Sequence, residues 1–162
     1  MKTIAAVLLA LSGSFLAAVP ADAQAPPPYG AAITLEQAKT VLAGAEAEAR
    51  KNNWNVVICV VDPGGHLVAL SRLDNTQFGS IEVARQKAYG AVAYRRPTKV
   101  FQDAIAKGGE NMRLLGLTGA SLLEGGIPIV VDGKVVGAVG VSGVTAAQDA
   151  QTGQAGIDAL KK

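Results

Sequence analysis

The chain has 162 residues, of which 49% are hydrophobic and 17% charged, with a net charge of +2. This balance is typical of a folded globular domain and excludes a disordered chain. The basic residues are scattered, with only Arg95-Arg96 and Lys161-Lys162 adjacent, so the sequence does not have the basic patch of a nucleic-acid-binding protein. Cys59 is the only cysteine, which excludes an intramolecular disulfide and a cysteine metal cluster.

The first 23 residues have the features of a secretion signal. Lys2 supplies a positive charge, residues 4–11 and 15–19 are apolar, and Ala21-Asp22-Ala23 is a small-x-small cleavage motif. The apolar stretch is interrupted and short for a membrane span. We therefore expect a cleavable signal peptide over 1–23, cut after Ala23, rather than an uncleaved anchor. The mature protein would be periplasmic or secreted, without a transmembrane segment.

Two regions follow the cleavage motif. Residues 24–33 are rich in proline, which predicts an extended arm. Residues 34–162 have the size of a single domain. Within it, Thr34 and Gln37 form a capping box that opens a first helix, and the unbroken apolar run 56–61 predicts a strand buried on both faces.

The middle of the chain predicts a hairpin and two helices. Asp62-Pro63-Gly64-Gly65 is a turn that leads into a partner strand over 66–73. Ser80 is placed to cap a second helix that ends before Pro97, and Thr98 to cap a third over 99–107. Residues 110–124 are ambiguous between a short helix and a strand, followed by a loop.

The stretch 125–143 predicts a second hairpin. Asp132-Gly133 between β-branched runs is the strongest short hairpin signal, because a type I′ turn needs positive φ at both positions. Glycines at 137, 140 and 143 indicate close backbone packing, a bulge or a ligand. Thr145 and Gln148 form another capping box for a final helix. The order of elements predicts a mixed α/β (α+β) fold, an antiparallel sheet in an α/β/α sandwich.

His66 has two interpretations from the residues alone. It is either a turn histidine bonded to backbone or solvent, or a metal or haem ligand, since neutral imidazole is the commonest such ligand. A Cys59–His66 catalytic pair would need a third group that the spacing does not supply.

Lys87, Gly90 and Tyr94 share one face of the second helix. This flat patch with polar ends suits a planar carboxylated ligand, with its carboxylates at Lys87 or Arg72. The alternative is that the lysine stem and the tyrosine ring cover the sheet or a subunit contact. Arg72 and Asp74 could also form a surface ion pair.

Taken together, these residues resemble the GlcG/HbpS haem-binding-like family, which is related to the C-terminal domain of some corrinoid adenosyltransferases. The matching motifs run in order from about Thr34 to Leu160. They are Asp62-Pro63-Gly64-Gly65-His66-Leu67, Arg72-Leu73-Asp74, Ala84-x-x-Lys87-Ala88, Pro97-Thr98, Gly125-Gly126-Ile127-Pro128-Ile129, Asp132-Gly133, Gly137-Ala138-Val139-Gly140-Val141-Ser142-Gly143 and Asp149.

The resemblance implies a profilin-like fold with a five-stranded antiparallel sheet between helices, and assembly into multimers. Some members of the family bind haem. Among these, the threonine that follows the proline after the second helix lies near the iron, which carries over to Thr98.

The leading hypothesis is an exported homo-oligomer that binds a small molecule, haem or a related tetrapyrrole. The predicted iron contacts are His66 and Thr98, with Lys87 and Arg72 as partners of the propionates and Tyr94 beside the ring.

Two other classes of protein stay open. One is an enzyme acting on a hydroxy acid or another carboxylate, with Asp62, Lys87 or Asp149 as acid or base. The other is an assembly module without a ligand. The scarcity of catalytic residue types favours a binding protein over an enzyme.

Overall fold

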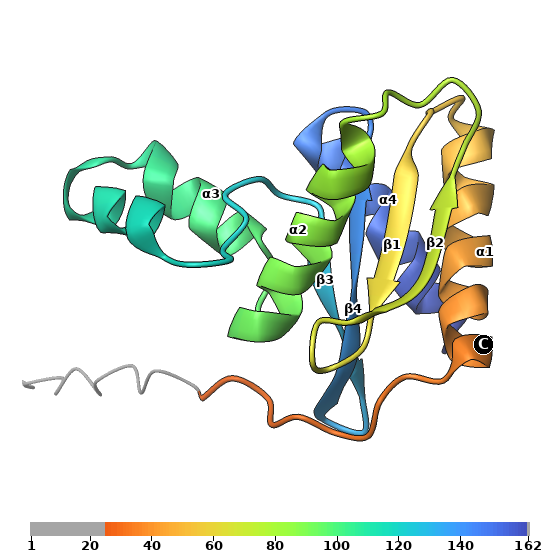
Figure 1. The fold of residues 1–162 in the computed structure, drawn as a ribbon, viewed down its shortest axis with the longest axis horizontal. Coiled ribbons are helices and arrows are strands. Elements are labelled where there is room, and N and C mark those ends of the chain that lie inside the picture. Colours follow the sequence, from red (N-terminus) through yellow and green to blue (C-terminus); the bar gives the residue numbers. More distant parts are fainter. Residues whose placement is uncertain (1–24, 162) are drawn as a thin grey trace, which may run out of the picture.

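The structure, a computed structural model, describes residues 25–161. The predicted signal peptide, residues 1–23, and Lys162 lie outside the described residues. The elements in chain order are α1 (Leu35–Lys51), β1 (Val57–Val61), β2 (Leu67–Arg72), α2 (Ser80–Tyr94), α3 (Lys99–Ala106), the 3₁₀ helix η1 (Gly109–Gly116), β3 (Gly126–Val131), β4 (Lys134–Ser142) and α4 (Ala146–Ala159) (Figure 1).

The four strands form one antiparallel sheet in the order β2-β1-β4-β3. The sandwich class is as predicted, but the expected fifth strand is not among the described residues. The arm comes closest to this role, because Tyr29 forms an isolated bridge with Val135. Residues 26–28 are all proline and have no backbone N–H, so the arm cannot donate ladder hydrogen bonds on the N-terminal side of this bridge.

Helices cover both faces of the sheet. The α1 and α4 helices pack together on one face, and α2 covers the other (Figure 1). Alternate residues of β1 follow this division: Ile58 and Val60 belong to the core under α1 and α4, and Val57, Cys59 and Val61 to the core under α2. All five are buried, as the unbroken apolar run predicted.

The second hairpin has the predicted turn, with positive φ at Asp132 (49°) and Gly133 (71°). The glycines of β4 serve close packing. A Cβ at Gly140 would collide with the carbonyl oxygen of Ala84 and the amide nitrogen of Ala88. The α2 backbone therefore lies directly on β4 at this point, which only a glycine permits.

Two of the four predicted helix caps are confirmed. Thr34 with Gln37 and Thr145 with Gln148 form complete capping boxes. The prediction for Ser80 and Thr98 was wrong, since neither side chain caps its helix. Both are buried, and their hydroxyls bond elsewhere: Ser80 pairs with Ser142 at 3.1 Å, and Thr98 bonds the chain before β3. Tertiary hydrogen bonds took precedence over local capping.

The ambiguous stretch contains η1, and together with α3 it projects to one side of the body (Figure 1). Phe101 anchors it, with its ring edge-on to Tyr94 at a centroid distance of 5.3 Å. Val100, Met112 and Leu115 remain exposed there. No described helix has the length and apolar character needed to cross a membrane.

We expect Gly140→Ala to lower the free energy of unfolding by about 1–3 kcal/mol, because the new methyl group would push α2 off β4. Urea unfolding followed by circular dichroism measures this. Gly116→Ala is the matched control, since a Cβ there meets nothing within 4 Å. Equal stability of the two variants would show that the α2–β4 contact can relax.

Candidate functional site

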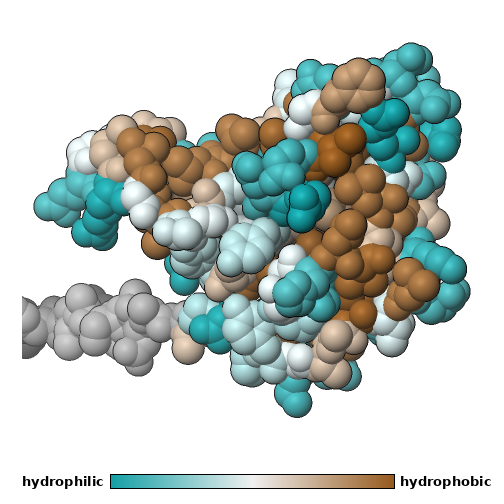
Figure 2. All heavy atoms as spheres, in the orientation of Figure 1, coloured by the Kyte–Doolittle hydropathy of each residue, from teal (hydrophilic) through white to brown (hydrophobic). Residues whose placement is uncertain are grey.

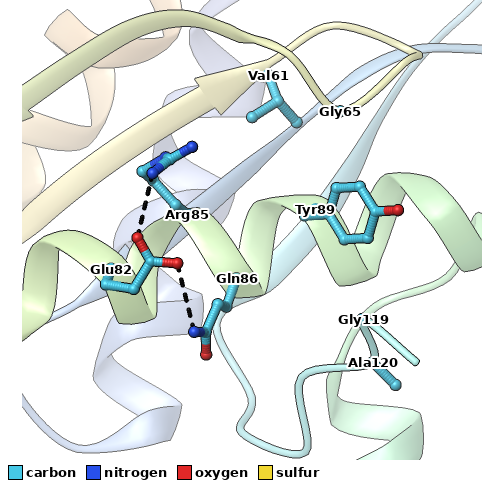
Figure 3. A pocket seen from close by; sticks show the side chains of 8 residues that line it. All are labelled: Val61, Gly65, Glu82, Arg85, Gln86, Tyr89, Gly119 and Ala120. Carbon is cyan, nitrogen blue, oxygen red and sulfur yellow. Dashed lines mark hydrogen bonds and ion pairs between the residues drawn. The ribbon is translucent and has the colours of Figure 1, made fainter. Parts of the chain in front are cut away.

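A groove lies between the β1–β2 turn, α2 and the segment 117–125, which we call the η1–β3 loop (Figure 3). Its volume is about 360 Å³. It is lined by Val61, Gly65, Glu82, Arg85, Gln86, Tyr89, Gly119 and Ala120. The helix contributes the polar side chains, and the turn and the loop contribute mostly backbone.

The turn is held in place by Asp62. Its Oδ1 accepts hydrogen bonds from the amides of Gly64 at 2.8 Å and His66 at 3.0 Å. The imidazole of His66 lies beside Gly64, where a Cβ would come within 3.1 Å of Nε2. His66 is exposed, and no residue of the range 25–161 hydrogen-bonds its ring. The sequence placed this histidine in a turn, and the structure leaves its imidazole available to a ligand.

Tyr89 forms one wall of the groove. Its ring lies between two glycines with positive φ, Gly65 (81°) in the turn and Gly119 (74°) in the η1–β3 loop. A Cβ on either glycine would lie 2.5 Å from a ring carbon. The ring is therefore clamped from both sides, while 44% of the residue stays exposed and its hydroxyl bonds no other residue of the described range.

Arg85 supplies the groove's positive charge and pairs with Glu82 at 3.1 Å. Both side chains are more than half exposed, so this ion pair contributes little stability and leaves Arg85 free to rearrange. Sequence reasoning missed Arg85 and Tyr89. The signal was present: Glu82, Arg85 and Tyr89 are spaced i, i+3 and i+7 on the helix face opposite the alanine stripe.

Lys87, by contrast, points into the interior. Its Nζ donates to Asp149 Oδ2 at 2.7 Å and to the carbonyl of Val141 at 2.9 Å. Both charged side chains are only 3% exposed. The ammonium passes the backbone at Gly125, where a Cβ would lie 2.9 Å from Nζ. The ion pair thus joins α2 to the first turn of α4, beside the start of β3.

Burial raises the pKa of the Asp149 carboxyl, because desolvation disfavours its charged form. The Lys87 ammonium and the backbone amides of Val144 and Gly143 oppose this effect. Oδ1 accepts from the Val144 amide at 3.2 Å. Lys87 and Asp149, which were both considered as acid or base, therefore form an ion pair with each other that is shielded from solvent.

Thr98 is also fully buried. Its hydroxyl donates to the carbonyl of Leu123 at 2.7 Å and accepts from the amide of Gly126 at 3.0 Å. Thr98 therefore fixes the chain as it enters β3. Every buried side-chain nitrogen and oxygen in the described range has a partner.

The predicted helix stripe exists, but the η1–β3 loop covers it. The Tyr94 hydroxyl donates to the Thr118 carbonyl at 2.5 Å, and a Cβ at Gly90 would lie 2.8 Å from the Ser121 amide. Arg72 lies at the other end of β2 from His66, roughly 20 Å away along six residues of strand. Its guanidinium stacks over Phe78 at 5.0 Å, and none of the ion pairs in the described range joins it to Asp74.

Cys59 is buried in β1, and burial raises the pKa of its thiol to about 12. A thiolate is the reactive form of cysteine, so Cys59 is inert and does not pair with His66. Within residues 25–161, no three histidine, cysteine, aspartate or glutamate side chains gather into a metal site.

The fold and the groove define an α/β/α sandwich domain with an exposed imidazole at the β1–β2 turn that borders the groove. A family model described as "Haem degrading protein HbpS-like" matches residues 33–158. The chain belongs to this HbpS-like family, as the sequence motifs indicated.

Individual relatives agree with this assignment. The chain is 43% identical to the protein GlcG of Escherichia coli K12 over 112 residues, which are 68% of this chain and 81% of GlcG. A structure of a double mutant of HbpS from Streptomyces reticuli matches with a TM-score of 0.72 at 28% identity, covering 96% of this chain and 97% of that one. A haem complex of PduOC matches with a TM-score of 0.72 at 26% identity, covering 79% and 94%.

The buried ion pair gives a testable prediction. Lys87→Met and Asp149→Asn should each lower the free energy of unfolding by about 3–5 kcal/mol, because each leaves a buried group without its partner. The double variant should lose less than the sum, with a coupling energy of about 2–3 kcal/mol from a double-mutant cycle. The exposed pair Lys99–Asp103 is the control, and its cycle should show no measurable coupling. Additive losses at Lys87 and Asp149 would contradict the assignment.

The stability of Lys87→Met should depend on pH in a defined direction. A carboxyl whose pKa is raised in the folded protein contributes most to stability at pH values below its pKa in the unfolded chain, ordinarily 3.8. This contribution is lost as pH rises through the pKa of the folded protein. Lys87→Met removes the opposing cation, so its stability should fall relative to the wild type as pH rises from that value toward neutral.

Proposed function

We propose that this protein binds haem or a related tetrapyrrole in the groove, with His66 as an iron contact. The observation that carries the proposal is the exposed imidazole of His66, which has no hydrogen-bond partner among residues 25–161 and follows directly on Gly65, a residue that lines the groove. One imidazole is enough for this ligand, since the macrocycle supplies the other nitrogen ligands to the iron. A bare metal ion would need several protein ligands, which are not gathered at this turn.

The lining of the groove fits a flat, carboxylated ring. Val61, Ala120 and the glycine backbone offer apolar surface, and Tyr89 offers the face and edge of a fixed ring. Arg85 can leave its exposed partner Glu82 to bind a propionate, for which a guanidinium is well suited. Apolar residues also gather over the β1–β2 side of the body (Figure 2), and Leu67, the first residue of β2, is 52% exposed.

The relatives support the same ligand. The family description names haem degradation, and the PduOC relative was crystallised with haem. In this proposal haem supplies the iron chemistry, and the chain binds and orients it.

The other residues that the sequence predicted as haem contacts do not line the groove. Thr98 and Lys87 could reach a ligand only after the η1–β3 loop moved away, because both are buried beneath it and bonded within the chain. Tyr94 would then be freed from Thr118 as well. Arg72 lies too far along β2 to share a ring with His66. Arg85 therefore takes the role of propionate partner in the arrangement that the groove favours.

An absorption titration of the mature protein with haemin tests this. We expect a saturable shift of the Soret band for the wild type. His66→Ala should lower the affinity for haemin at least tenfold, because the iron loses its imidazole. Arg85→Gln should weaken binding severalfold without changing the position of the band. Thr98→Val, checked for folding by circular dichroism, should leave the spectrum unchanged. A flat wild-type titration would end the haem proposal, and loss of binding in Thr98→Val alone would move the site to the interior.

We also propose that the protein is exported after cleavage at Ala23 and assembles into a homo-oligomer. The signal-like sequence supports export, and exposed apolar side chains on the projecting segment and on β2 support assembly. Native mass spectrometry of protein recovered from the periplasm tests both. We expect a subunit that begins at Gln24, in complexes of several subunits. A subunit retaining Met1, or only monomers, would contradict the corresponding half of the proposal.

A further inference from the structure

We infer that the free edge of β2 pairs with β2 of a second copy of this chain, antiparallel and around a two-fold axis, so that Arg72 of each copy lies beside His66 of the other. The pairing specifies the contact surface of the proposed homo-oligomer, and the role of Arg72 rests on the proposed haem function. Two observations carry it: the difference between the two edges of the sheet, and the complementary ends of β2.

The sheet has two edge strands, β2 and β3, and the edge of β3 is closed. The Gly125 carbonyl accepts from the Val141 amide, so the alternation of an antiparallel ladder turns the backbone groups of Gly126 and Pro128 away from β4. Thr98 bonds both groups of Gly126, because its amide donates to the carbonyl at 2.9 Å and its hydroxyl accepts from the amide at 3.0 Å. Pro128 has no N–H to donate. Another strand therefore finds little to bond on this side.

The edge of β2 is open. The Leu73 amide donates to the Val56 carbonyl at 3.0 Å, so the same alternation turns the backbone groups of Leu70 and Arg72 away from β1. Within residues 25–161, no hydrogen bond reaches these groups from the outer side. The strand also contains no proline and no lysine, two of the devices by which edge strands avoid pairing. It therefore presents an unused template for another strand.

The face of β2 beside α2 is uncovered as well. Helix α2 packs on β1, β3 and β4, and apolar residues remain visible over the β1–β2 side of the body (Figure 2). A large apolar side chain marks each end of this strip. Leu67 at the start of β2 is 52% exposed, and Phe78, beneath the Arg72 guanidinium at the other end, is 80% exposed. Apolar surface of this kind is typical of an interaction site.

A second copy of the chain is the partner that fits this edge. In an antiparallel pair centred on Leu70, each Leu70 exchanges backbone hydrogen bonds with its counterpart. Arg72 then lies opposite the Leu67–Val68 end of the other copy, where Val68 has no partner in β1. Phe78 beneath Arg72 is thereby brought to the exposed Leu67 of the other copy, and the contact occurs twice. The two ends of β2 complement each other, as a two-fold interface requires.

The pairing also changes the surroundings of His66. Within one chain, Arg72 and His66 are separated by the length of β2, roughly 20 Å. Across the pair, Arg72 of the second copy is a diagonal neighbour of His66, with Cα atoms roughly 7–8 Å apart. None of the ion pairs in the described range involves Arg72. The second copy thus supplies a cation for a carboxylate of the ligand that the imidazole binds.

An engineered cysteine tests the pairing in the mature protein. Leu70→Cys places two thiols opposite each other, with Cα atoms about 5.5 Å apart, which is within the range of a disulfide. We expect mild oxidation with diamide to convert this variant into a disulfide-linked dimer, seen by non-reducing electrophoresis. Val130→Cys, at an exposed position on β3, is the matched control and should crosslink far more slowly. Cys59 does not interfere, because its thiol is buried.

A charge at the interface tests the pairing and the role of Arg72 together. Leu67→Lys should oppose pairing, because it places an ammonium against Phe78 of the second copy. We expect sedimentation velocity to show fewer subunits per particle for this variant, whereas Val130→Lys at the closed edge should match the wild type. Arg72→Gln should weaken haemin binding severalfold in the wild-type background and have no effect in the Leu67→Lys background, where no second copy reaches His66.

The outcomes separate the interface from the ligand. Leu70→Cys that crosslinks no faster than Val130→Cys, or Leu67→Lys particles of wild-type size, would overturn the pairing. If the wild type binds no haemin, the proposed function fails, while crosslinking still decides the pairing. If haemin binds and Arg72→Gln loses equal affinity in both backgrounds, or none in either, Arg72 does not act across the interface.

Discussion

The buried ion pair between Lys87 and Asp149 is the constraint on which the arrangement of layers depends. Removing two charges from water is costly unless each finds its partner and further hydrogen bonds. Here the ammonium also bonds the Val141 carbonyl, and the carboxylate accepts from the Val144 amide. To satisfy these bonds, α2 and α4 must hold one position relative to the end of β4. Gly125 must lack a side chain, because Lys87 and Asp149 occupy the space a Cβ would need.

This constraint separates a fixed interior from an adaptable surface on the same helix. The residues of α2 that pack on the sheet include the small alanines Ala84, Ala88 and Ala91, and Lys87 is the one charge of the helix that is buried. The opposite side carries Glu82, Arg85 and Tyr89, whose polar ends are exposed. Because the interior fixes the helix, these side chains are presented to the β1–β2 turn at a defined register. A binding groove gains precision when its side chains come from such a rigid element.

Local patterns predicted those parts of the fold that depend on neighbouring residues. Asp132-Gly133 and the capping boxes at Thr34 and Thr145 follow from backbone requirements that a short stretch already contains. The β1 run predicted burial because a strand covered on both faces must be apolar throughout. Ser80 and Thr98 were misjudged because capping is also a local rule, whereas their actual partners, Ser142 and Gly126, lie 62 and 28 residues away. No short-range pattern contains that information.

The same distinction explains the candidate site. The place of His66 at a turn could be predicted because its residue type and the turn residues before it are both visible in sequence. Lys87 was predicted to contact a ligand because the helix stripe reveals which residues share a face. The stripe does not reveal that the η1–β3 loop covers this face or that Lys87 pairs with Asp149. Arg85 and Tyr89 were overlooked because an exposed helix face is usually only a solvated one. Their importance comes from Gly65 and Gly119, which bring two loops from distant parts of the chain against one ring. A glycine with positive φ that touches an exposed aromatic side chain is thus a sign of a built surface, and here it marks the groove more clearly than any charged residue does.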